Sequence, residues 1–243
     1  MKTGTVRQIL LITDGCSNYG EDPVTMAALA KELGITVNVI GVMENDVIEE
    51  RGVREIEEIA LQGGGVSEIV YARSLSQTVQ MVTRKAMTQT LQGVVNKELK
   101  QILGNDAGLE SLPPDKRGEV LEVVEELNET VDLEILILVD TSASMKNKLP
   151  TVKEALLDLS LSLNARTGNN HFSLFVFPGK RSEVEKLLDW TPKLETLTSV
   201  FSKLTPGGMT PTGPAIKAAT AYFGRNKAAE LFNDEEGYYK ESV

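Results

Sequence analysis

The sequence has little cysteine and histidine and no long hydrophobic run. Cys16 is the only cysteine among 243 residues, so a scaffold held by intrachain disulfides is excluded. No stretch of eighteen apolar residues occurs, and no apolar segment of signal-peptide length precedes Asp14. His171, the only histidine, opens a predicted strand and supports no Ser-His-Asp triad. With 41% hydrophobic and 25% charged residues, we expect a soluble, cytoplasmic globular protein.

An excess of positive charge is also missing. The chain carries 35 acidic and 25 basic residues, a net charge of −10. Ten of the acidic and two of the basic residues lie within residues 104–134, which leaves 25 acidic and 23 basic residues elsewhere. The acidity therefore belongs to one segment, and neither that segment nor the remainder has the basic stripe that a phosphate backbone requires. We expect neither a nucleic-acid nor a membrane partner.

Strand-like and helix-like segments alternate in the first third of the chain. The apolar run Gln8–Thr13 is typical of a strand buried on both faces of a parallel sheet. Asp22 and Pro23 predict a helix start, and Gly34 predicts its end. The same alternation continues through a strand at Ile35–Val42, a helix at Arg54–Leu61, a strand at Glu68–Ala72 and a helix from Leu75.

The second half begins a similar pattern again. The predicted strands are Leu133–Val139, His171–Phe177 and Val184–Trp190, and the predicted helices are Thr151–Ala165, Thr196–Leu204 and Pro214–Phe223. The Pro178-Gly179 turn predicts that the last two strands form an antiparallel hairpin. Three strands alone would expose open sheet edges, so both halves together predict one sheet. The fold class is α/β: a doubly wound, mostly parallel six-stranded sheet with one antiparallel edge strand and helices on both faces.

A single domain is expected over residues 1–230, followed by a polar tail at 231–243. Residues 93–132 would form an acidic helical connector between residues 1–92 and residues 133–230. A stripe of apolar residues at helical spacing predicts that this helix packs on the domain: Val120, Val123, Val124, Leu127 and Val131. A docking surface for a basic partner is the alternative interpretation of the same segment.

Oxygen-bearing side chains follow the two most apolar strands. Asp14 comes directly after the first of them, and Asp140, Ser142 and Ser144 follow the second. Ligands of parallel sheets bind beyond the carboxyl ends of the strands, and such oxygen donors favour Mg²⁺, Mn²⁺ or Ca²⁺. The glycine-rich loop at 207–213 adds two further hydroxyls, those of Thr210 and Thr212. Each residue alone could instead cap a helix or form a turn.

These motifs resemble those of the von Willebrand factor A family. The segment DTSAS resembles the family's Asp-x-Ser-x-Ser signature, GGMTPTG its threonine loop, and LLITDG its second-aspartate strand. The resemblance implies a metal-ion-dependent adhesion site with the ligands Asp140, Ser142, Ser144, Thr210 and Asp14. The second aspartate comes first here, whereas the family places it last. The chain therefore resembles a circularly permuted member, in which residues 1–92 match the family's C-terminal half.

The resemblance implies protein recognition without turnover. A site of this kind would hold Mg²⁺ or Mn²⁺ and bind an Asp or Glu carboxylate of a partner protein. Two alternatives stay open: a Mg²⁺-dependent enzyme of phosphoryl transfer or hydrolysis, and a metal-free scaffold. No phosphate-binding lysine loop follows the glycines at 63–65, and no catalytic constellation is evident. We expect a monomer or, because the connector is long, a swapped dimer.

Overall fold

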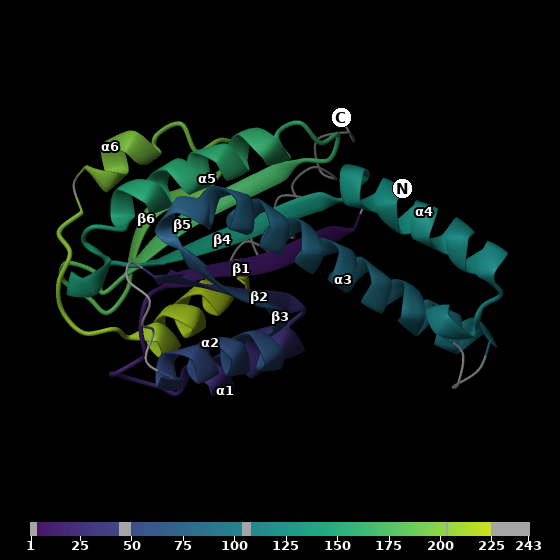
Figure 1. Ribbon diagram of the computed structural model, residues 1–243, viewed down its shortest axis with the longest axis horizontal. Coiled ribbons are helices and arrows are strands. Elements are labelled where there is room, and N and C mark those ends of the chain that lie inside the picture. The colour runs from purple at the N-terminus through teal and green to yellow at the C-terminus, as the bar shows by residue number, and fades with distance from the viewer. Residues whose placement is uncertain (1–3, 44–49, 104–107, 203, 225–243) are drawn as a thin grey trace, which may run out of the picture.

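A single mixed sheet runs through the molecule and combines strands from both halves of the chain (Figure 1). The computed structural model describes residues 4–43, 50–103, 108–202 and 204–224. The strand order is β3-β2-β1-β4-β5-β6, so the halves meet where β1 lies parallel to β4. Five strands are parallel, and the edge strand β6 is antiparallel to β5. The predicted fold class is confirmed.

The strands lie close to their predicted positions. Their bounds are β1 Thr5–Thr13, β2 Ile35–Met43, β3 Gly64–Tyr71, β4 Asp132–Asp140, β5 Asn170–Phe177 and β6 Glu185–Thr191. The predicted start of β3, at Glu68, is four residues too late, because the glycines at 63–65 indicated a loop. Gly65 lies inside the strand instead, where a Cβ atom would come within 2.1 Å of the Val37 carbonyl oxygen. Glycine at this position allows β3 to pass close to β2.

The helices divide between the two faces of the sheet (Figure 1). They are α1 Pro23–Glu32, α2 Glu50–Gln62, α3 Leu75–Leu103, α4 Pro114–Thr130, α5 Leu149–Leu163 and α6 Leu197–Phe201, with a further helix at 212–224 and short 3₁₀ turns at Ala72–Ser74, Leu109–Ser111 and Ala143–Met145. The helices α1, α2 and 212–224 bury one face of the sheet, while α3, α4, α5 and α6 bury the other. Burial on both faces explains why the parallel strands are continuous apolar runs.

The helices α3 and α4 form an arm that extends past the end of the sheet (Figure 1). Residues 93–103 of the predicted connector continue α3, which has 29 residues and a length of about 44 Å. The predicted packing of the α4 stripe is wrong for its first half, because Val123 is 51% exposed. Only the last section of the stripe packs on the domain, through Val124, Leu127 and Val131. Because Val123 directly precedes the buried Val124, the buried side of α4 is narrower than the predicted stripe.

Two further expectations concern the surface and the end of the chain. Among the described residues, none of the helices combines the length and apolar character that crossing a bilayer requires. The predicted polar tail at 231–243 lies outside the described residues.

The predicted hairpin of β5 and β6 is present, and the Phe177-Pro178 peptide bond in its turn is cis.

Candidate metal site

The parallel pairing of β1 and β4 brings the two predicted aspartate loops together. The register pairs Ile12 with Val139, so Asp14 and Asp140 follow neighbouring strands at the same edge of the sheet. Strands at the middle of a sheet leave little freedom to the residues that immediately follow them. The loops therefore begin from fixed positions, although the two aspartates are 126 positions apart in sequence.

Asp140 is a buried carboxylate with two neutral hydrogen-bond donors. Its side chain accepts the hydroxyl of Thr13 at 2.7 Å and the backbone N–H of Ser142 at 2.8 Å. Burial raises the pKa of Asp140 to about 6, because these bonds offset only some of the cost of removing the carboxylate from water. An ionised carboxylate can accept about four hydrogen bonds, so Asp140 retains acceptor capacity for a cation.

A row of oxygen atoms leads from the β4 loop to Asp14. The hydroxyls of Ser142 and Ser144 lie 3.1 Å apart, and the Ser144 hydroxyl donates to Asp14 Oδ1 at 2.8 Å. The other carboxylate oxygen of Asp14 accepts from the ammonium of Lys148 at 2.5 Å. The structure thus brings four of the five predicted ligands into one hydrogen-bonded group around the ends of β1 and β4.

The threonine loop is tied to both aspartate loops by backbone contacts. Thr210 donates its N–H to the Asn18 side chain at 2.8 Å, and its carbonyl accepts the Asn18 N–H at 3.2 Å. Gly207 donates its N–H to the carbonyl of Thr141 at 2.9 Å. Gly208 has φ +90°, a conformation that favours glycine, which explains the paired glycines. The fifth predicted ligand therefore comes from a loop that is held against the other two.

The two candidate threonines differ in how their hydroxyls lie. Within the portion of the chain that the structure describes, the Thr210 hydroxyl makes no hydrogen bond, and the residue is 7% exposed. The Thr212 hydroxyl is fully enclosed at the start of the helix 212–224 and also has no partner. Of the two residues Thr210 is the more exposed, and its loop is the one that contacts Asn18.

The donor set fits a hard divalent cation. All five predicted ligands would bind a metal through side-chain oxygens. Two of these residues are aspartates, and the other three carry hydroxyls. Over the described residues, no three His, Cys, Asp or Glu side chains gather in a group that could hold a metal. Zinc and copper sites rely on imidazole or thiolate, whereas Mg²⁺ and Mn²⁺ accept carboxylate, hydroxyl and water oxygens. A buried Asp140 with free acceptor capacity is the feature that a cation would satisfy.

Sequence reasoning missed Thr13 and Lys148. Thr13 was not among the predicted ligands, although it borders the oxygen-bearing loop of Asp14, and Lys148 was not singled out. The 3₁₀ turn at Ala143–Met145 turns the chain so that Lys148 stands close to Ser144 and Asp14. The spacing of four residues between Ser144 and Lys148 is the one signal that could have indicated a shared face.

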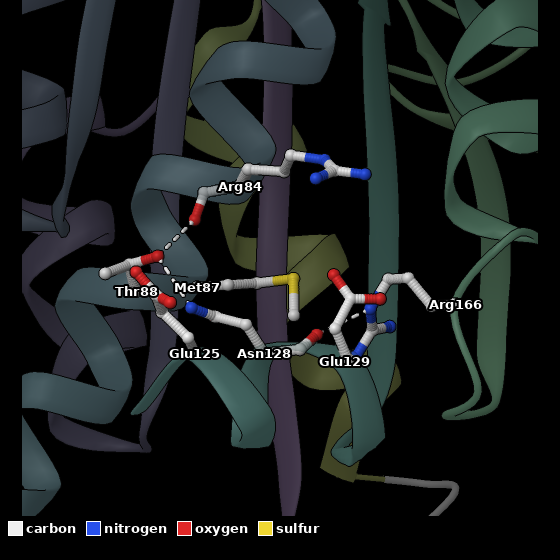
Figure 2. A pocket seen from close by; sticks show the side chains of 7 residues that line it. All are labelled: Arg84, Met87, Thr88, Glu125, Asn128, Glu129 and Arg166. Carbon is white, nitrogen blue, oxygen red and sulfur yellow. Dashed lines mark hydrogen bonds between the residues drawn. The ribbon is translucent and has the colours of Figure 1, made fainter. Parts of the chain in front are cut away.

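A cavity of about 380 Å³ lies far from these loops, between α3, α4 and the chain after α5 (Figure 2). Arg166 borders it and donates to the carbonyls of Asn128 and Val131, both at 2.7 Å, and to the Asn170 side chain at 2.6 Å. These carbonyls belong to the last turn of α4 and to the residue that caps it, where a cation also complements the helix dipole. Arg166 thus joins α4 to the start of β5, which is a structural role.

Comparison with known proteins identifies several relatives. A family model described as von Willebrand factor type A domain matches residues 135–236. An uncharacterized protein YabS of Bacillus subtilis (strain 168) is 64% identical over 240 residues, which cover 98% of each chain. A crystal structure of an uncharacterized protein from Alicyclobacillus acidocaldarius is 42% identical and has a TM-score of 0.85, covering 93% of this chain and 96% of that one.

A more distant likeness concerns proximal thread matrix protein 1 of the mussel byssus, solved with a zinc-occupied MIDAS motif. It is 17% identical, with a TM-score of 0.26, and covers 84% of this chain and 43% of that one. A score this low carries no argument about the present fold or site.

Proposed function

The chain belongs to the von Willebrand factor type A domain family, and from this premise we propose that it is a protein-interaction module that depends on a divalent metal. Asp140, Ser142, Ser144, Thr210 and Asp14 would hold Mg²⁺ or Mn²⁺ at the ends of β1 and β4. The bound cation would then accept an Asp or Glu carboxylate of a partner protein. The proposal includes binding without turnover.

The buried carboxylate of Asp140 carries the proposal. Among the described residues its hydrogen bonds come from neutral groups of Thr13 and Ser142, and burial raises its pKa to about 6. A buried charge of this kind costs stability unless an opposite charge compensates it. A divalent cation beside Asp140 would supply that compensation, and the neighbouring hydroxyls would fill further positions without neutralising the ion.

The ligand set supports recognition of an anion. Two carboxylates and three hydroxyls fill five positions, so a six-coordinate divalent cation would keep one position for a further oxygen ligand. A partner carboxylate supplies both a charge and an oxygen ligand. His171 lies exposed at the other end of the sheet, at the start of β5, and is paired in register with Glu134, so it offers no base to this site.

We further propose that the family's order is permuted in this chain. The matched segment 135–236 includes the loops of Asp140 and Thr210 but not Asp14. Strand β1, which precedes Asp14, lies directly beside β4 and supplies the missing aspartate from the first third of the chain. A chain order in which the second aspartate comes first still builds one site, because the sheet pairs the two strands.

A thermal melt with and without Mg²⁺ or Mn²⁺ tests the proposal. A cation at a hundredfold excess over its Kd adds about 2.7 kcal/mol to the free energy of unfolding. For a chain of this size the melting temperature should rise by roughly 5–10 °C relative to chelator. The shift should vanish in Asp140→Ala and persist in Asp158→Asn, a control on the exposed side of α5. An equal shift in both variants, or none in the unaltered protein, contradicts the proposal.

A further inference from the structure

We propose that Lys148 sets the specificity of this site: its buried ammonium weakens binding of the divalent cation itself and strengthens binding of an anion to the loaded site. This inference rests on the proposed metal site. It concerns a residue outside the five predicted ligands, and the ion pair of Lys148 with Asp14 is the observation that leads to it.

The ion pair is enclosed and fixed from both sides. The Lys148 side chain is 10% exposed and that of Asp14 is 3% exposed, with 2.5 Å between Nζ and Oδ2. Lys148 stands at the first position before α5, where its N–H donates to the Met145 carbonyl and its carbonyl accepts the N–H of Val152. Both backbone groups of Lys148 are therefore engaged, which fixes the point from which its side chain reaches Asp14.

Asp14 divides its two oxygens between different partners. Oδ1 accepts the hydroxyl of Ser144, which belongs to the predicted ligand set, while Oδ2 accepts from Lys148. One side of the carboxylate therefore faces the site and the other faces a permanent cation. Lys148 neutralises some of the charge that Asp14 would otherwise offer to a metal.

The net charge of the site predicts that Lys148 has opposite effects on the affinities for a cation and for an anion. Asp14 and Asp140 carry two negative charges and Lys148 one positive charge, so the site is formally at −1 before loading and at +1 with a divalent cation. Without the ammonium, the same states would be at −2 and 0. A nearby unit charge in a partly buried site changes an affinity by about tenfold or more. Lys148 should thus oppose the cation and favour the anion.

A purely structural role for the ion pair predicts something different. If Lys148 only joined α5 to the β1 loop, its removal would lower the free energy of unfolding and change both affinities in the same direction or in neither. Opposite changes in cation and anion affinity require an electrostatic effect on the site itself. The sign of the two changes therefore separates the two roles.

The test compares Mn²⁺ binding with acetate binding in matched variants. Lys148→Met removes the charge and retains the length of the side chain, while Lys146→Met removes an exposed charge from the same turn. Calorimetry gives the Mn²⁺ affinity, and water-proton relaxation of the Mn²⁺-loaded protein follows acetate. We expect Lys148→Met to bind Mn²⁺ about tenfold more tightly and acetate several-fold more weakly, with Lys146→Met unchanged.

Two further variants keep the test decisive. Lys148→Arg retains the charge and should behave like the unaltered protein, and Lys148→Gln provides a neutral side chain that still donates to Asp14 if the methionine variant does not fold. Unchanged affinities, or changes of the same sign, in the neutral variants overturn the inference while leaving the metal site intact. Failure of the unaltered protein to bind Mn²⁺ overturns the proposed function itself.

Discussion

Two aspartates in different regions of the molecule accept the same kinds of hydrogen bond with opposite results. Asp22, at the start of α1, accepts the N–H and the hydroxyl of Thr25 at 2.8 and 2.6 Å. Asp140 accepts a backbone N–H and a threonine hydroxyl at nearly the same distances. The hydrogen bonds from Thr25 lower the pKa of Asp22, whereas burial raises the pKa of Asp140 to about 6.

Burial accounts for the difference between the two carboxylates. Asp22, the N-cap of α1, is exposed. Its carboxylate therefore remains hydrated and also accepts two hydrogen bonds. Asp140 has 0% exposure, so its carboxylate accepts the same kinds of hydrogen bond but loses its hydration. The comparison shows that two neutral donors suffice at the surface but not inside the fold. A buried carboxylate left in this state is suited to a cation.

Arg166 tests whether burial alone makes a charge unfavourable. It is 8% exposed, and burial lowers the pKa of its guanidinium, yet three acceptors of fixed geometry contact it. We expect Arg166→Met to lower the free energy of unfolding by about 3–5 kcal/mol, because three buried acceptors lose their donor. Urea denaturation measures the change.

Arg84 provides the control for this prediction. It lines the same cavity from α3, is exposed, and makes no ion pair or side-chain hydrogen bond within the described ranges. Arg84→Met should change the free energy of unfolding by no more than about 0.5 kcal/mol. Similar values for the two variants would mean that the three bonds of Arg166 contribute little, and that the comparison between compensated and uncompensated buried charge is wrong.

Asp140→Asn should stabilise the metal-free protein, which is the opposite of what most substitutions in a buried site do. The pKa of Asp140 rises from its ordinary 3.8 to about 6 on folding, which corresponds to about 2–3 kcal/mol at neutral pH. The protonated carboxyl favours the fold, so this contribution is present below about pH 4 and is lost as the pH rises through 6. An asparagine keeps the uncharged form at every pH.

Chemical denaturation in chelator between pH 4 and 8 measures this effect. The advantage of Asp140→Asn over the unaltered protein should be small at pH 4, grow up to pH 6 and stay constant above pH 7. The asparagine oxygen can accept from Ser142, and its amide can donate to a rotated Thr13 hydroxyl, so the contacts survive. A variant that is less stable than the unaltered protein at pH 8 would show that Asp140 is already compensated.

The sequence predicts the sheet well because its strands are buried on both faces. Continuous apolar runs such as Ile135–Val139 arise only where helices cover both sides, so the run itself indicates a parallel strand. The loop ligands follow from the same logic, because Asp14 and Asp140 stand directly after such strands. The sequence therefore predicts the features that depend on neighbouring residues along the chain or on a shared edge of the sheet.

The features that the sequence does not predict depend on contacts between distant segments. The ion pair of Lys148 joins residues 134 positions apart, and nothing near Lys148 in sequence indicates its burial. Helical spacing predicts that α4 has an apolar side, but not that Val123 is exposed while its neighbour Val124 is buried. Helical periodicity predicts which residues share a face of the helix, but not which other elements that face contacts.

Asp22→Ala completes the comparison at the surface and should have the smallest effect. Loss of the N-cap leaves the Thr25 N–H without its acceptor, which lowers the free energy of unfolding by about 1 kcal/mol. Because folding lowers the pKa of Asp22, this contribution is present above about pH 4 and is lost as the pH falls below it. Denaturation at pH 7 and pH 3 should thus give a larger difference at pH 7 than at pH 3. The pH dependence is opposite in sign to that of Asp140, and equal signs for the two aspartates would mean that burial does not distinguish them.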